Sequence, residues 1–348
     1  MPNASATHLT RRGILAAGGA LGLGAVLTAC GDDDAKSCGS GDGTAAAKSG
    51  PWSFKDDRGK TVELDKVPAN IVAFTGVAAA LWDYGVQVKG VFGPTTTKDG
   101  KPDVQAGDID VDKVTVLGNE WGKLNVEKYA ALAPELLVTT TFDTAGTLWS
   151  VPEESKDKIA KLAPSVAISV FDRQLTQPLQ RMWELAESLG ADTKAKKVTD
   201  AKAAFEKAAA RLRAAAKAKP EIRVLAGSAS AELFYVSGTN LSVDLEYFKA
   251  LGVNFVEPSE EAKKATGGWF ESLSWENVDK YPADIIIMDD RASTIQPADI
   301  TEGTWKQLPA VKAGQVIARS PEPILSYDKC TPLLDNLAEA IENAKKVG

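Results

Sequence analysis

From Trp52 onward, short runs of β-branched and aliphatic residues alternate with helical stretches along the chain. This alternation is typical of α/β units whose strands are mainly parallel. Strands are predicted at 71–74, 88–92, 114–117, 136–140 and 166–170 in a first half of the chain, and at 222–227, 234–237, 254–256, 284–288 and 316–318 in a second half. We therefore expect two α/β lobes, each built around a central, mainly parallel sheet.

One long helix is predicted between these halves. Residues 191–219 are almost entirely Ala, Lys, Glu and Arg, and Val198, Phe205 and Leu212 fall on one helical face. No Gly or Pro interrupts the stretch before Pro220, and the helix propensity is high, so a single helix of about 28 residues and about 42 Å is expected. Its heptad pattern covers only two repeats, which is too few to predict a coiled coil.

The amino-terminal segment reads as an export signal. A polar start leads through Arg11 and Arg12 into an apolar stretch at 13–29, which ends in Leu-Thr-Ala-Cys at 27–30. The stretch is short and rich in Gly and Ala, which favours a signal peptide over a transmembrane helix. Thr-Arg-Arg-Gly-Ile-Leu resembles the bacterial twin-arginine export motif. Leu-Thr-Ala-Cys resembles a lipobox, which implies lipidation of Cys30 and a membrane anchor on the extracytoplasmic face.

A flexible tether is predicted directly after Cys30, because residues 31–50 contain no aliphatic or aromatic residue larger than Ala. The expected organisation is a signal peptide at 1–29, lipidated Cys and tether at 30–51, an N-terminal Rossmann-like lobe at 52–190, a connecting helix at 191–219 and a C-terminal Rossmann-like lobe at 220–348. An oxidising compartment permits a disulfide between Cys38 and Cys330, and the sequence leaves that pairing open.

Composition excludes several classes of function. The chain has 348 residues, 44% of them hydrophobic, and 47 Asp and Glu against 40 Lys and Arg, which is a soluble, acidic profile unsuited to nucleic acid. Its one histidine, His8, lies in the predicted signal peptide, so the mature protein would lack His-ligated zinc, a Ser-His-Asp triad and a Cys-His dyad. We find no GxSxG, HExxH or Gly-rich phosphate loop, so neither catalytic residues nor a resident metal or other cofactor is expected.

A weak internal repeat supports the two-lobe prediction. The segments LNVEKYAALAPELLV and LSWENVDKYPADIII share a small polar residue, a Glu two positions later, a short helix, a proline, an acid and a buried strand. Asn125 and Ser274 are the expected helix caps, with Glu127 and Glu276 in the first turns. From the residues alone, each Glu could simply complement a helix dipole.

Taken together, the lipobox, the tether, the two lobes, the long helix and the paired Glu units resemble the siderophore- and cobalamin-binding lipoproteins of ABC importers. These belong to the helical-backbone periplasmic binding proteins. The segment WKQLPAVKAGQVIA at 305–318 resembles their closing Trp-x-x-Leu-x-Ala-Val-x-x-Gly-x-Val pattern, and the resemblance covers about residues 52–346. It implies a monomer with two lobes that barely change their angle on binding. It also implies that Glu127 and Glu276 dock with arginines of the membrane permease.

The residue types present in the predicted mature chain restrict the classes of ligand that we expect. Without mature histidines and with scattered cysteines, direct capture of bare zinc or manganese is not expected, whereas a metal already held by a chelator needs no protein ligand. A catecholate chelate is strongly anionic and requires clustered basic groups, which the predicted loops lack. A ferric hydroxamate is neutral or cationic, so aromatic walls and one or two donors suffice. We therefore predict capture of a ferrioxamine-like ferric hydroxamate for an ABC permease. Cobalamin or haem binding, an anchored extracytoplasmic enzyme, and a docking protein without a small ligand are the alternatives.

Candidate ligand-binding residues lie at predicted strand ends or loops. Related hydroxamate binders usually carry an arginine at the stretch that matches Gly-Asn-Glu-Trp-Gly-Lys, and this chain has none there. Arg291 and Arg319 instead follow strand ends, where open α/β sheets bind ligands. Core packing is the alternative for each aromatic residue, and a surface salt bridge for each arginine. The full set is Trp82, Trp121, Phe142, Trp149, Trp269, Arg291, Arg319 and Tyr327.

Overall fold

The computed structural model describes residues 50–348. The predictions for the export signal, for lipidation of Cys30, for Cys38 and for almost all of the tether lie outside these residues. No helix in the described range is long and apolar enough to cross a membrane.

The N-terminal lobe is built on a five-stranded, all-parallel sheet in the order β5-β4-β3-β6-β7. Both faces are covered, which explains why every residue of β3 and β6 is buried, including the three threonines that end β6. A hairpin of β1 and β2, which the sequence analysis did not predict, precedes the sheet. The elements are β1 (Trp52–Lys55), β2 (Thr61–Leu64), β3 (Ile71–Phe74), α1 (Thr75–Asp83), β4 (Gly90–Phe92), η1 (Val104–Ala106), η2 (Val111–Lys113), β5 (Thr115–Gly118), α2 (Val126–Ala131), β6 (Leu136–Thr141), η3 (Glu153–Ser155), α3 (Lys156–Leu162) and β7 (Ser165–Ser169).

The C-terminal lobe contains a six-stranded sheet in the order β11-β9-β8-β12-β13, with the short β10 paired to β8. Strands β8, β10, β12 and β13 are parallel, whereas β9 and β11 run antiparallel at one edge. Strand β11 was not predicted. The elements are β8 (Arg223–Ala229), β9 (Leu233–Ser237), α6 (Val243–Ala250), β10 (Asn254–Phe255), α7 (Glu260–Lys263), η4 (Lys264–Thr266), β11 (Phe270–Ser274), η5 (Trp275–Lys280), β12 (Ile285–Asp289), η6 (Pro297–Asp299), α8 (Gly303–Gln307), α9 (Pro309–Lys312), β13 (Val316–Arg319) and α10 (Tyr327–Asn343).

The connection between the lobes runs through α4 (Thr176–Ser188) and the long helix α5 (Lys196–Ala218), which has 23 residues. Helix α5 begins five residues later than the predicted start at 191. The Asp192 side chain accepts a hydrogen bond from the Lys194 N–H at 3.1 Å, and this local turn competes with helix formation. The prediction of two α/β lobes joined by one long helix is confirmed.

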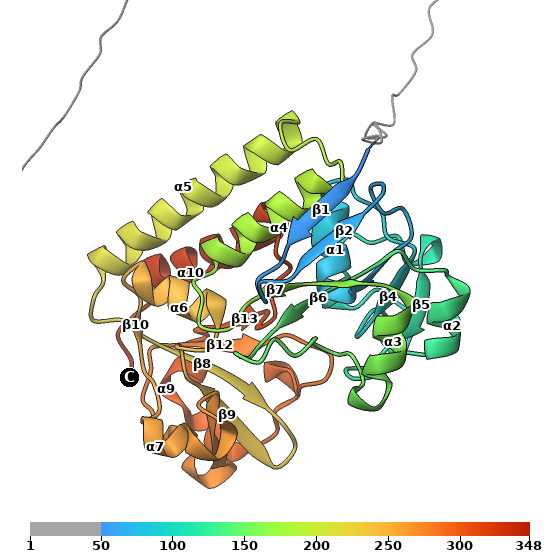
Figure 1. Cartoon of the computed structure of the whole chain (residues 1–348). Helices are drawn as coiled ribbons and strands as arrows, with labels where there is room; N and C mark the ends of the chain where they lie inside the picture. Colours follow the sequence, from blue (N-terminus) through green and yellow to red (C-terminus); the bar gives the residue numbers. More distant parts are fainter. Residues whose placement is uncertain (1–49) are drawn as a thin grey trace, which may run out of the picture. The chain divides into compact units, whose positions relative to one another are not determined.

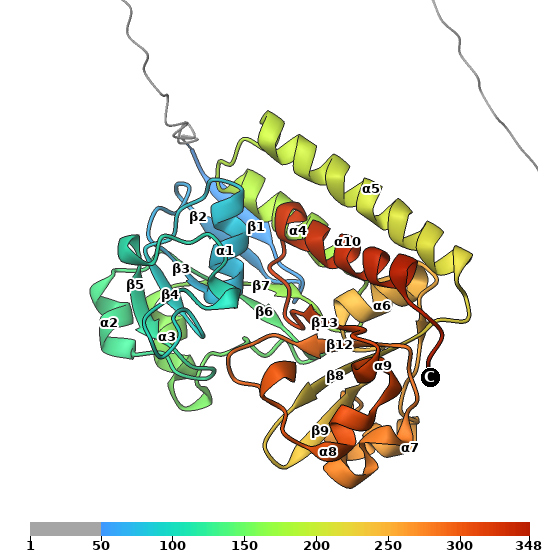
Figure 2. The same cartoon turned by 180° about the vertical axis from the view of Figure 1, so that it is seen from behind.

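Helix α10 packs along α5, as both views of the chain show (Figures 1 and 2). Arg211 on α5 pairs with Glu342 at 2.7 Å and with Asp335 at 3.1 Å, both on α10. The two helices therefore form a double brace on the connecting side of the molecule.

The apolar core is continuous across this brace. One cluster of buried residues extends from the N-terminal sheet through α4, α5 and α10 to one face of the C-terminal sheet. A second cluster covers the opposite face of that sheet and contains Trp305 and Ala310 of the closing motif. Within residues 50–348 Cys330 has no disulfide partner; its thiol is fully buried in α10, and burial raises its pKa.

Candidate functional site

A cavity of about 520 Å³ lies where carboxyl ends of strands from both lobes meet. We call it the interlobe cavity. Its size falls within the range of about 300–1,000 Å³ that is usual for small-molecule sites. It is lined by Phe142, Asp143, Thr147, Trp149, Gly227, Ser228, Ser237, Ser242, Trp269, Phe270, Asp289, Arg291, Arg319, Pro321 and Glu322.

Aromatic rings from both lobes face each other at this cavity. Phe142 and Trp149 follow β6 in the N-terminal lobe, with ring centroids 4.5 Å apart. Trp269 precedes β11 in the C-terminal lobe, and its ring centroid lies 6.1 Å from that of Phe142. The structure thus brings together three of the aromatic residues that the sequence analysis singled out.

A narrower extension of about 40 Å³ continues from the same walls, with Phe142, Trp269 and Glu322 shared between the two spaces. Thr140 also lines this extension. Its hydroxyl is buried and has no hydrogen-bond partner within residues 50–348. Because an unpaired buried hydroxyl is costly, Thr140 is a ready hydrogen-bonding group for a ligand. The sequence analysis did not identify it.

Arg291, one of the predicted ligand contacts, lines the cavity, but carboxylates already engage its guanidinium. Its Nη2 lies 2.6 Å from Asp289 Oδ2, its Nε lies 3.0 Å from Asp289 Oδ1, and its Nη1 lies 2.7 Å from Glu322 Oε1. Burial opposes the charge of Arg291, yet the two carboxylates outweigh this effect and raise its pKa.

Arg319 also lines the cavity, and it too is paired. Its Nε and Nη2 donate to the two carboxylate oxygens of Asp244 at 2.7 and 2.9 Å. Both side chains are buried. Such a two-point geometry fixes the guanidinium and compensates its charge.

Glu322 is the residue at the centre of this polar wall, and the sequence analysis missed it. It lies between β13 and α10, and its side chain is 12% exposed. Besides Arg291, its carboxylate accepts hydrogen bonds from Trp149 Nε1 at 3.2 Å and Gln105 Nε2 at 3.3 Å. Burial raises the pKa of Glu322, although Arg291 acts in the opposite direction.

Three predicted ligand contacts fall outside the cavity lining. The Trp121 ring centroid lies 5.6 Å from Cζ of Arg291, in a cation–π arrangement. Trp82 packs from α1 against the apolar core. Tyr327 is buried at the start of α10, with ring centroids 5.4 Å from Phe205 and 5.7 Å from Trp183. In this structure Trp82 and Tyr327 thus occupy packing positions away from the cavity, with Tyr327 buried and Trp82 partly buried.

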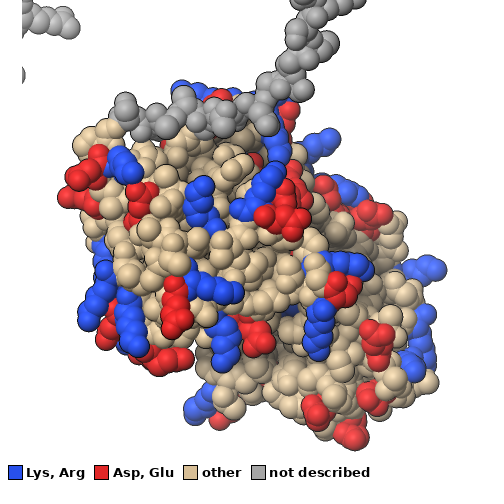
Figure 3. Space-filling model, turned by 90° about the vertical axis from the view of Figure 1, so that its right-hand side faces the viewer, with Lys and Arg blue, Asp and Glu red and all other residues tan. Residues whose placement is uncertain are grey.

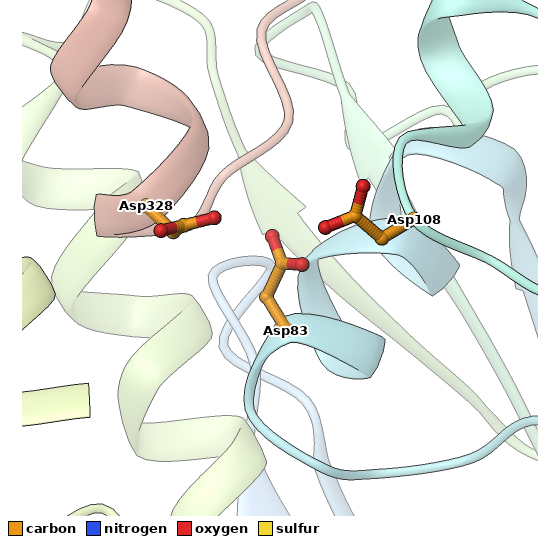
Figure 4. Close-up of side chains that lie close together, drawn as sticks. All are labelled: Asp83, Asp108 and Asp328. Carbon is orange, nitrogen blue, oxygen red and sulfur yellow. The ribbon is translucent and has the colours of Figure 1, made fainter. Parts of the chain in front are cut away.

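A separate group of carboxylates lies beside α10. Asp83, Asp108 and Asp328 point toward one another, with oxygens within 4.8 Å (Figure 4). Lys329 Nζ lies 2.6 Å from Asp108 and 3.1 Å from Asp328, and Ser326 donates to Asp83 at 2.5 Å. Lys329 and Ser326 thus link α10 and the residue before it to Asp108 and Asp83 of the N-terminal lobe.

Surface charges do not gather by sign on the face shown in Figure 3, where Lys and Arg are interspersed with Asp and Glu. That face offers no extended basic surface for a polyanion.

Residues 71–323 match the model of a family described as periplasmic binding protein. The chain belongs to this family. The match spans both lobes and confirms the resemblance that the sequence motifs indicated. It also agrees with the expectation of a binding protein rather than an enzyme. A comparison with curated proteins found no match.

Among solved structures, that of DesE, a ferric-siderophore receptor protein from Streptomyces coelicolor, is 95% identical, covers 85% of this chain and 100% of that chain, and has a TM-score of 0.85. The petrobactin-binding protein YclQ from Bacillus subtilis shares the fold at 19% identity, with 84% and 99% of the chains covered and a TM-score of 0.60. The FhuD protein from S. pseudintermedius does so at 21% identity, with 84% and 98% covered and a TM-score of 0.56.

The two repeat units occupy equivalent places in the two lobes, each leading into a buried strand, β6 or β12. Asn125 caps α2 as predicted, since its side chain accepts from the Lys128 N–H at 2.9 Å. Ser274 makes no such cap bond at the start of the 3₁₀ helix η5, and its hydroxyl instead accepts from Asn277 Nδ2 at 3.0 Å. Glu127 and Glu276 are both exposed, as a docking role requires.

Proposed function

We propose that this chain is an extracytoplasmic lipoprotein that captures a ferric hydroxamate siderophore and delivers it to an ABC permease for iron uptake. Membership of the periplasmic binding protein family supports a binding role. The 95% identity to DesE, a ferric-siderophore receptor protein, supports a ferric siderophore as the ligand.

The choice of a hydroxamate rests on one observation: the cavity combines aromatic walls with arginines that are already paired. Two guanidiniums and three carboxylates line it, and Asp244 lies behind Arg319. A strongly anionic catecholate chelate would have to compete with these carboxylates for each arginine. A trihydroxamate core is neutral around ferric iron and can be held by aromatic surface and a few hydrogen bonds.

In this proposal the iron is cargo and its chelator fills the coordination sphere. The chain itself would contribute Phe142, Trp149 and Trp269 as apolar walls and Thr140 as a hydrogen-bonding group. No metal ligand or resident cofactor of the protein is required.

Titration of the purified protein by tryptophan fluorescence tests the ligand class. A ferric trihydroxamate should quench the indoles of Trp149 and Trp269 and bind more tightly than a ferric triscatecholate, cobalamin or haem. Equal or tighter binding of any of these three would overturn the hydroxamate assignment. Failure of every chelate to bind would overturn the binding function.

The membrane anchor is tested at Cys30. Replacement by Ala should release the protein from membranes or leave it as an uncleaved precursor. A Cys30→Ala variant that fractionates with membranes at mature length would refute lipidation at this residue.

A further inference from the structure

Glu322 occupies a backbone position that is fixed by its neighbours in the sequence. It lies between Pro321 and Pro323. The first proline has its own φ locked, and the second restricts the residue before it to extended conformations. The Glu322 side chain is therefore presented to the cavity at little further cost in conformational entropy.

The carboxylate of Glu322 is held from both lobes. Arg291 in the C-terminal lobe contacts Oε1 at 2.7 Å, whereas Trp149 and Gln105 in the N-terminal lobe donate to Oε2 at 3.2 and 3.3 Å. Gln105 itself is buried. These contacts satisfy the carboxylate and prevent it from turning away from the cavity.

Glu322 also changes what Arg291 can offer a ligand. Asp289 engages Nε and Nη2 of the guanidinium, and Glu322 engages Nη1, so each of its three nitrogens faces a carboxylate. Two negative charges thus surround one positive charge at this wall. Because the wall is largely shielded from water, the excess negative charge acts on a ligand more strongly than a surface charge would.

We propose that Glu322 is the charge-selecting residue of the interlobe cavity, favouring chelates with a cationic end group and disfavouring those with an anionic one. This inference rests on the proposed function and specifies the ligand's charge rather than its iron-binding groups. Glu322 acts both directly, through its own charge, and indirectly, by occupying Arg291.

The test uses three ferric trihydroxamates that share one core and differ only at one end. That end is a free ammonium, which is positive, an acetylated amine, which is neutral, or a succinylated amine, which is negative. Dissociation constants are measured for the wild type and for Glu322→Gln. The wild type should bind them in the order cationic, neutral, anionic. In Glu322→Gln the ratio of cationic to anionic affinity should fall about tenfold or more, the effect of one unit charge roughly 7 Å away in a partly shielded site.

Asp143→Asn is the matched control, since Asp143 lines the same cavity but its carboxylate accepts from the backbone of the exposed Thr147. Removing this better-solvated charge should change the ratio by less than about threefold. A change as large as that in Glu322→Gln would assign the selectivity to the general field of the protein and overturn the proposal.

Binding of the neutral chelate by Glu322→Gln, within a few-fold of the wild type, reports that the variant is folded. If it does not fold, the wild type is measured at low and high salt. A preference set by the shielded Glu322 should persist, whereas one set by exposed charges should vanish. Loss of the preference in high salt, equal wild-type binding of all three chelates, or an unchanged ratio in Glu322→Gln would each refute the proposal. In contrast, failure of all three to bind the wild type would refute the proposed function itself.

Discussion

Glu135 in the N-terminal lobe and Asp284 in the C-terminal lobe hold the same position in the repeated unit, but their surroundings differ. Glu135 Oε2 accepts from the Ala69 and Asn70 N–H groups just before β3, at 2.6 and 2.9 Å. Asp284 Oδ2 accepts from the Arg223 N–H at the start of β8, at 2.8 Å. Each acid thus ties the strand that follows it to the neighbouring parallel strand.

The acid in the C-terminal lobe, Asp284, also makes hydrogen bonds that Glu135 does not make. Asp284 Oδ1 also accepts from the Val347 and Gly348 N–H groups, both at 2.7 Å, and the Asp284 side chain is fully buried. The Glu135 side chain is 27% exposed and pairs with Lys66 at 3.0 Å. The acid of the repeated unit therefore clamps two parallel strands together in each lobe. This clamp is partly solvated at Glu135, whereas at Asp284 it is buried and also holds residues 347 and 348.

The two lobes also differ in the side chains that they contribute to the interlobe cavity. The N-terminal lobe contributes mainly aromatic surface through Phe142 and Trp149, with Asp143 as its one charged lining residue. The C-terminal lobe contributes Trp269 and also the buried ion pairs of Arg291 and Arg319. The charged side chains that line the cavity are thus concentrated in the C-terminal lobe.

The largest expected effect is on ligand affinity, and it distinguishes the aromatic side chains of the C-terminal lobe from those of the N-terminal lobe. Trp269→Ala should weaken binding of a ferric trihydroxamate about 10- to 100-fold, because burial of an indole face contributes roughly 1–3 kcal/mol. Phe142→Ala, which removes a smaller ring, should weaken it less. Fluorescence titration measures both. Trp82→Phe is the control and should leave affinity unchanged, since Trp82 lies outside the cavity; a comparable loss there would contradict the placement of these walls.

Asp284→Asn should lower the free energy of unfolding by about 1–3 kcal/mol at neutral pH, because it weakens the acceptor of several buried N–H groups. Burial by itself raises the pKa of Asp284, but the N–H groups of Gly348 and Arg223 and the Lys346 ammonium lower it to about 2. Since this is below the ordinary value of 3.8, the stabilisation is present above pH 3.8 and is lost as the pH falls toward 2. The gap between variant and wild type should therefore close over that range in thermal or urea unfolding.

Glu135→Gln measures the contribution of the N-terminal lobe's acid to the free energy of unfolding, for comparison with Asp284→Asn. The Asn70 N–H, the Lys66 side chain and the Ala69 N–H lower the pKa of Glu135 to about 2 as well. Because this clamp is partly solvated, its loss should cost less than about 1 kcal/mol. A cost equal to that of Asp284→Asn would show that burial does not separate the two lobes' clamps.

If Glu127 and Glu276 dock with the permease as proposed, the two residues should behave symmetrically. Glu127→Ala and Glu276→Ala should each reduce siderophore uptake by cells several-fold and leave the ligand dissociation constant unchanged, since rim charges act mainly on the rate of encounter. Glu339→Ala, at an exposed acid on α10, is the control and should leave uptake intact. Loss of ligand binding in either docking variant would assign that residue to folding or to the cavity.

The smallest effect concerns the angle between the lobes. Because an apolar core and two packed helices connect the lobes, the radius of gyration with and without ligand should differ little in solution scattering. A change of several ångströms would show that the brace of α5 and α10 bends.

The sequence by itself determined the lobes and most of their strands. Parallel strands that are covered on both faces are rich in apolar residues, so β3, the first half of β6 and most of β12 can be recognised as short apolar runs in the sequence. The strands that were missed lack this signal: β1 alternates buried and exposed positions, and β11 includes polar residues at a sheet edge. The start of α5 was missed because the Asp192 carboxylate accepts a hydrogen bond from the Lys194 N–H, and this turn delays the helix.

The cavity was only partly determined by sequence. Strand ends indicated Phe142, Arg291 and Arg319, since the carboxyl ends of parallel strands gather at one edge. A Pro-Glu-Pro sequence one residue after a strand was the available sign of Glu322.

Only the tertiary structure decided which groups meet. Glu322 lies 31 residues from Arg291 and 173 from Trp149 in the chain, and the packing of the two lobes brings all three together. The same packing buries Tyr327 against α5 and leaves Trp269 at the cavity. Local sequence fixes what a residue can bind, but it does not encode the long-range contacts that decide which partners it has.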